Sequence, residues 1–159
     1  MSRETSLPRH PPEIIWQWGV CPEYQDPDFL ARVVKGATAL DAYDVLDLEI
    51  RAVDRVWVLL RDAFLPPPVL ARVLERIKAQ ADEWEAGHRA HTLSEVARRE
   101  QRGHRWRAAA CIASATVRKR DQQRLSVEAA YDEEYQRQLA IIREELDAFV
   151  SPEKGSPHA

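Results

Sequence analysis

The chain has 159 residues, a length that fits one domain and allows roughly two thirds of the unfolded surface to be buried. Its net charge of −3 and isoelectric point near 6.0 argue against a surface built mainly for nucleic acid, which requires an excess of positive charge. Cys21 and Cys111 show no metal or redox spacing, and the amino terminus lacks the apolar core of a signal peptide. We therefore expect a cytoplasmic protein with reduced thiols and no membrane-spanning segment.

The helical signals cover most of the chain and leave short ends. Residues 1–12 and 151–159 are polar or proline-rich, and we expect both to be flexible tails. Residues 13–150 form the predicted helical domain. No pattern with the two-residue period of a strand persists beyond a few residues, so we predict an all-α, single-domain bundle of about five to seven helices.

The first predicted helices are short and are marked by residues at their ends. Two prolines precede residues 13–18, which we expect to form a short helix ended by Gly19, although the Ile-Ile-Trp-Gln-Trp sequence could equally form a strand. Asp26, followed by proline, is an N-cap signal for a second helix. Thr38 with Asp41 opens a third.

The clearest amphipathic pattern lies in the middle of the chain. Apolar residues recur there in alternating steps of four and three, at Leu46, Ile50, Val53, Trp57, Leu60 and Phe64. Three consecutive prolines should end this helix, and a second apolar stripe over 70–84 predicts another helix that Gly87 ends. We interpret Trp57 and the other aromatic residues at helical spacing as core residues.

The stretch 92–150 contains one glycine and no proline. Thr92 and Glu95 have the spacing of a capping box, so we predict that a helix begins near Leu93. This stretch should supply a long C-terminal helix or a helical hairpin.

Two features interrupt the apolar face of that stretch. Gly103 lies on the face and indicates either close approach of another backbone or a break in the helix. Charged residues replace the apolar stripe over 118–126, where we expect a break or hairpin. The alternative is one helix over 93–149, roughly 85 Å long at 1.5 Å per residue, which exceeds the dimensions of a compact domain of this size.

The sequence contains none of the common catalytic motifs. It lacks the glycine-rich phosphate loops, the nucleophile elbow and the His-Glu-x-x-His zinc motif. His88, His91, His104 and Cys111 could converge on a metal, but their spacing is better explained by solvated loop histidines. We therefore predict a protein that is not an enzyme and that has neither a metal nor a cofactor.

Charge is distributed unevenly along the chain, which gives two candidate binding surfaces. The acidic segment, our predicted contact for a protein partner, comprises Asp41, Asp44, Asp47 and Glu49. The alternative basic face, for nucleic acid or an acidic partner, comprises Arg98, Arg102, Arg105 and Arg124.

Several segments, in order, resemble a predicted bacterial immunity-protein family of small alanine-rich helical proteins linked to polymorphic toxin systems. Gly-Val-Cys-Pro-Glu at 19–23 is similar to the start of the family, residues 38–44 to its short acidic helix, and residues 53–60 to its Trp-Leu-rich helix. The tract Trp-Arg-Ala-Ala-Ala-Cys-Ile-Ala-Ser-Ala resembles its C-terminal half. The resemblance implies an inhibitor with no catalytic residues.

These observations lead to two functional hypotheses. The first is a non-enzymatic, immunity-like inhibitor, a monomer or homodimer, that neutralises a toxin or another protein by stoichiometric binding, with the acidic segment steering a basic partner. The second is a phage or regulatory helical protein that binds nucleic acid or a nucleoprotein host-defence complex through the basic face.

Overall fold

The structure is a computed structural model that describes residues 7–80, 86–120 and 127–151. The elements of this part are two 3₁₀-helices, η1 (Pro12–Trp18) and η2 (Pro22–Gln25), and seven α-helices, α1 (Pro27–Val33), α2 (Ala42–Leu46), α3 (Ala52–Leu59), α4 (Pro67–Ala79), α5 (Ala86–Gln101), α6 (Arg105–Arg120) and α7 (Val127–Val150). The predicted all-α fold is confirmed. Extended backbone pairs within these residues only at an isolated bridge between His10 and Leu40. None of the helices in the described ranges is long and apolar enough to cross a membrane.

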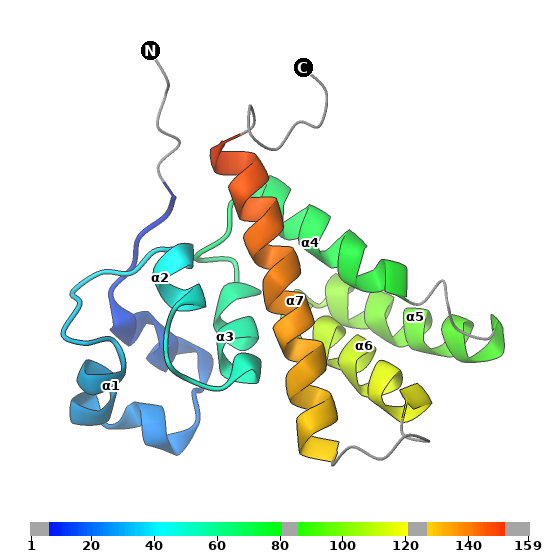
Figure 1. Ribbon diagram of the computed structural model, residues 1–159, viewed down its shortest axis with the longest axis horizontal. Coiled ribbons are helices and arrows are strands. Elements are labelled where there is room, and N and C mark those ends of the chain that lie inside the picture. Colours follow the sequence, from blue (N-terminus) through cyan, green and yellow to red (C-terminus); the bar gives the residue numbers. More distant parts are fainter. Residues whose placement is uncertain (1–6, 81–85, 121–126, 152–159) are drawn as a thin grey trace.

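Helix α7 lies between two groups of helices (Figure 1). The short helices α1 to α3 are on one side of it, and α4 to α6 are on the other. Helix α7 contacts α2, α3, α4 and α6, whereas α5 packs mainly on α6. With 24 residues, α7 is about 36 Å long at 1.5 Å per residue, and it joins both groups into one core.

The core is built on the apolar stripe of α7. Leu139, Ile142 and Leu146 are each at most 5% exposed and belong to the same buried cluster as Ile77 of α4 and Ile112 of α6. Fully burying an aliphatic side chain of this size stabilises a fold by roughly 1.5–3 kcal/mol. This stripe therefore holds the bundle together.

The first helices begin and end where short-range signals place them. Gly19 ends η1 with a φ of +70°, so the Trp-containing run is helical and not a strand. Asp26 caps α1 by accepting a hydrogen bond of 2.9 Å from the Asp28 amide. Asp41 caps α2 and forms a capping box with Asp44, in which each side chain accepts from the other residue's amide, at 2.9 and 3.0 Å.

The helix predicted over 46–64 is shorter in the structure. Helix α3 covers only Ala52–Leu59, while Leu46 is the last residue of α2 and Phe64 lies in the turn after α3. Both side chains are nevertheless buried in the common core, which is why the apolar spacing extends beyond the helix. The prolines begin the next helix as well as ending the pattern, because Pro67 occupies the first position of α4, where no amide hydrogen is needed.

The predicted helix start at Thr92 is wrong. Helix α5 begins at Ala86, which makes Thr92 an internal residue with only 6% of its surface exposed. Gly87 does not end the preceding helix either, because it lies in the first turn of α5. A threonine followed by glutamate at this spacing occurs inside helices as well as at their start. The burial of Thr92 is consistent with an internal position. Trp84 lies outside the described residues.

Gly103 marks a helix break and not a close approach of backbones. It has a φ of +74°, and a Cβ atom added there would meet nothing within 4 Å. The Gly103 amide donates to the Glu100 carbonyl at 2.9 Å, and the His104 amide donates to the Arg99 carbonyl at 2.9 Å. These two bonds form a Schellman motif that ends α5. Because α5 ends before Gly103 and α6 begins at Arg105, residues 93–149 are not one helix. The break predicted over 118–126 falls largely on residues 121–126, which lie outside the described residues.

Part of the segment that we expected to be a tail lies against the domain. The His10 amide donates to the Leu40 carbonyl at 2.9 Å, and the Leu40 amide donates to the His10 carbonyl at 2.8 Å. The His10 Nε2 atom lies 2.9 Å from the Ala63 carbonyl oxygen. Residues 7–12 therefore lead the chain directly into η1, while 1–6 and 152–159 lie outside the described residues.

Candidate binding pocket

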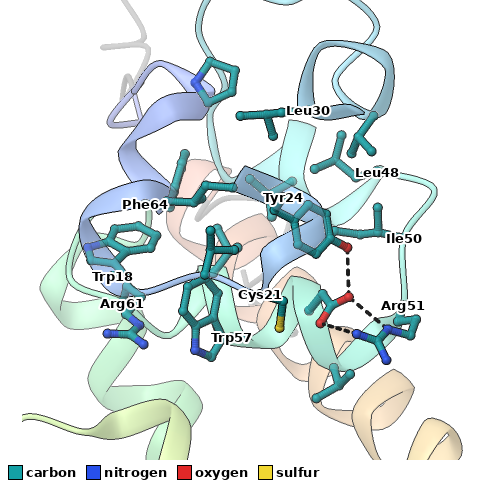
Figure 2. Close-up of a pocket in the computed structure, with 18 of the residues that line it drawn as sticks. Trp18, Cys21, Tyr24, Leu30, Leu48, Ile50, Arg51, Trp57, Arg61 and Phe64 are labelled. Carbon is teal, nitrogen blue, oxygen red and sulfur yellow. Dashed lines mark hydrogen bonds and ion pairs between the residues drawn. The ribbon is translucent and has the colours of Figure 1, made fainter. Parts of the chain in front are cut away.

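The N-terminal helices enclose a pocket of about 440 Å³ (Figure 2). Its walls come from η1, η2, α1, α3 and the segment between α2 and α3, with Trp106 and Arg107 contributed by α6. Apolar side chains cover most of the interior, among them Leu30, Leu48, Ile50 and Phe64. A mostly apolar pocket of this size with few polar groups is typical of sites that bind small molecules or side chains of a partner.

A hydrogen-bonded group closes one side of the pocket. The Tyr24 hydroxyl donates to Asp54 Oδ2 at 2.9 Å, and Arg51 Nε donates to the same oxygen at 3.0 Å. Burial, and then the hydrogen bond to Asp54, raise the pKa of the Tyr24 hydroxyl above its ordinary value. Tyr24 therefore stays protonated as a donor, and the Asp54 carboxylate is satisfied within the protein.

On the other side an arginine packs against two tryptophans. The rings of Trp18 and Trp57 meet edge to face with centroids 5.8 Å apart. The guanidinium carbon of Arg61 lies 5.6 Å from the Trp18 centroid and 4.5 Å from the Trp57 centroid. We call these three residues the Trp–Arg cluster. Trp18 ends η1, Trp57 belongs to α3, and Arg61 lies in the turn that follows α3.

The positive charge at this cluster is not balanced by the described part of the protein. The buried Arg61 Nε has no hydrogen-bond partner there, and neither Arg61 nor Arg107 forms an ion pair within those residues. Burial and the nearby charge of Arg107 lower the pKa of Arg61. Arginine remains charged at neutral pH despite such a shift, so two like charges lie near each other at the pocket.

The residues of the predicted acidic segment lie at the N-cap of α2, on α2 and in the loop after it, and they do not line the pocket. Asp41 and Asp44 form the capping box described above. Asp47 accepts from Arg143 of α7 at 2.7 Å, and the exposed Glu49 lies 3.7 Å from Lys35. Each carboxylate thus has a partner inside the protein. Whether these residues also contact another protein remains a prediction.

The predicted basic face is partly neutralised in the same way. Arg98 pairs with Glu95 on α5, and Arg105 of α6 pairs with Asp62. Arg102 is exposed near the end of α5, and Arg124 lies outside the described residues. The arginines that do border the pocket, Arg61 and Arg107, were not among those predicted.

The Trp–Arg cluster was not predicted, because the helical spacing of Trp57 with aliphatic residues indicated a core residue. In the structure Trp57 is half-buried and its ring packs on Arg61. The one available signal was an arginine four residues after a tryptophan, a spacing that can place a charge against an aromatic ring. In the described residues there is no group of three or more His, Cys, Asp or Glu side chains placed to hold a metal.

Fold and pocket define an all-α protein with an apolar pocket bordered by arginine and tryptophan. Comparison of the chain with protein-family models, with curated proteins and with solved structures gave no match. The resemblance to the immunity-protein family stays a prediction from the local segments quoted above.

Proposed function

We propose that this protein is a non-enzymatic inhibitor that binds a protein partner stoichiometrically, and that the Trp–Arg cluster is the centre of its contact surface. Tryptophan and arginine are the residues most enriched among those that dominate binding energy in protein interfaces. Here they are already packed on one another, so little side-chain freedom remains to be lost on binding. This preformed cluster is the observation that carries the proposal.

The neighbourhood of the cluster supports the same surface. The uncompensated charges of Arg61 and Arg107 favour an acidic patch on the partner. This differs from the basic partner expected from the acidic segment, whose carboxylates already have internal partners. The toxin class of the partner rests on the sequence resemblance.

The proposal is tested by inhibition stoichiometry. A protein captured from source-cell lysate by the immobilised chain is purified, and its activity is titrated with increasing amounts of the chain. We expect activity to fall linearly to an end point near one equivalent, as for an occluding inhibitor. Loss of activity at a few per cent of one equivalent would indicate turnover, and an unchanged activity at saturation would exclude inhibition.

Nucleic-acid binding is the alternative, and salt distinguishes it. If the basic face contacts phosphates, affinity for duplex or single strands falls by roughly one decade per decade of salt for each phosphate neutralised. Because Arg98 and Arg105 are paired with carboxylates, we expect only weak binding. Sub-micromolar binding near physiological salt would favour the alternative.

A further inference from the structure

The pocket beside the Trp–Arg cluster combines an apolar interior with uncompensated positive charge. Its interior is lined by residues such as Leu30, Leu48 and Ile50, and its volume of about 440 Å³ lies within the range of small-molecule sites. Among the described residues Asp54 is the only carboxylate that lines it, and Asp54 is held by Tyr24 and Arg51. The apolar interior and the cationic border together favour an amphipathic ligand, with an apolar body and an anionic group.

The charged end of such a molecule is set by Arg61 and Arg107. Both line the pocket, neither has a carboxylate partner within the described residues, and the Arg61 Nε is a buried donor without an acceptor. An anion placed between the two guanidinium groups would separate two like charges. Both neighbouring tryptophan rings pack on the Arg61 guanidinium, and a planar carboxylate matches the fork of a guanidinium group.

From this geometry we propose that the pocket binds a free amphipathic carboxylate, a small acid with an aliphatic or aryl body. The body lies among the apolar side chains, and the carboxylate lies at Arg61 and Arg107. This proposal is separate from the protein-binding function, because it concerns the purified chain alone and each can fail without the other.

The test measures tryptophan fluorescence and calorimetric binding with three probes of equal chain length: sodium octanoate, octan-1-ol and octylammonium chloride. Trp18 and Trp57 border the pocket and report its occupancy. We expect octanoate to bind saturably with one molecule per chain. The alcohol and the amine should bind at least about tenfold more weakly, since a charge-assisted hydrogen bond contributes about this factor. Equal binding of the three probes would overturn the proposal.

Variants locate the site. Arg61→Met and Arg107→Met should each weaken octanoate binding by about tenfold. Arg32→Met is the matched control, because Arg32 packs on an aromatic ring elsewhere, with its guanidinium carbon 5.9 Å from the Phe29 centroid. It should change the affinity by less than about twofold. Arg107 is exposed, so the Arg107→Met variant should fold and tests the proposed carboxylate site even if Arg61→Met does not fold.

A filled pocket gives an independent check. Ile50 is half-buried and lines the pocket, so Ile50→Trp should occupy the volume and abolish octanoate binding while the helical circular dichroism spectrum is retained. Undiminished binding to a folded Ile50→Trp variant would contradict the proposal. A second result would also contradict the proposal: binding of a peptide with a C-terminal leucine carboxylate, together with no binding of octanoate. That result would identify a protein segment as the occupant.

Discussion

The guanidinium carbon of Arg61 lies 4.5 Å from the centroid of the Trp57 ring, which is four residues earlier in the chain. The contact holds a charged group in a half-buried position beside an apolar pocket. Cation–π contacts contribute about 0.5–2 kcal/mol, enough to fix the geometry of both side chains without a carboxylate. The same pair carries the binding proposals above.

Stability should respond differently to the two members of this pair. Trp57→Ala should lower the free energy of unfolding by about 2 kcal/mol, less than the loss of a fully buried tryptophan, since the ring is half-buried. Arg61→Met should change it by less than about 1 kcal/mol, because the lost cation–π contact is offset by relief of burial and of repulsion from Arg107. Urea unfolding measures both, and a larger effect for Arg61→Met would show a structural role for its charge.

The capping box of α2 makes a second stability prediction. Asp41→Ala should lower the free energy of unfolding by about 1 kcal/mol, because the Asp44 amide loses its acceptor. Glu49→Ala, which removes an exposed carboxylate 3.7 Å from Lys35, should lower it by less than about 0.5 kcal/mol. Thermal or urea unfolding compares the two, and equal effects would argue against the cap.

That prediction also restricts how the acidic segment is tested as a contact surface. Replacing Asp41 or Asp44 by lysine would remove the cap as well as the charge. Asp47→Asn and Glu49→Gln avoid this problem because neither residue belongs to the capping box. Slower association of the double variant with a partner would support the acidic segment, and an unchanged rate would count against it.

Helices α4 and α7 are joined by the ion pairs of Glu145, and the neighbouring Glu144 provides a matched control variant. The largely buried Glu145 accepts from Arg72 at 2.8 Å and from Arg76 at 3.3 Å. Its neighbour Glu144, exposed to solvent, pairs with Arg76. Glu145→Ala should lower the free energy of unfolding by about 1–2 kcal/mol, and Glu144→Ala by less than about 0.5 kcal/mol. Chemical denaturation should show this order, and the reverse order would contradict the described packing.

Alkaline pH should destabilise the protein through Tyr43 and Tyr135. Burial raises the pKa of Tyr135 from 10.0 to about 12, and burial together with a hydrogen bond to Asp147 raises the pKa of Tyr43 to about 12. The protonated form is favoured by folding, so this contribution is complete below pH 10 and is lost as the pH rises toward 12. In Tyr135→Phe the free energy of unfolding should fall less steeply over this range, and an identical slope would show that Tyr135 ionises normally.

The parts of the fold that the sequence predicts are those set by neighbouring residues. Gly19, Asp26 and Asp41 act on the backbone within a few positions, so their helix ends can be predicted from a short window. The limits of α3 and α5 depend on tertiary packing. Phe64 continues an apolar spacing outside any helix, and the inward packing of Thr92 makes it an internal helical residue, which no local signal indicates.

The pocket could not be predicted for a related reason. Trp18 comes from η1, Arg61 from the turn after α3, and Arg107 from α6. Only the tertiary fold brings these three residues together. An apolar stripe that contains Trp57 has the same spacing whether the ring faces the core or borders a pocket. Likewise, sequence could identify the acidic segment, but not that Asp47 meets Arg143 from the other end of the chain.

One measurement tests most directly whether the Trp–Arg cluster is the contact surface. It compares the affinity of the Arg61→Met variant for the protein partner with the affinity of the Arg32→Met variant. Both substitutions remove one positive charge and one arginine packed on an aromatic ring, but only Arg61 belongs to the cluster. We predict that Arg61→Met raises the dissociation constant at least about tenfold, as for an interface hot spot, while Arg32→Met changes it by less than about twofold. Equal affinities of the two folded variants would contradict the proposed surface.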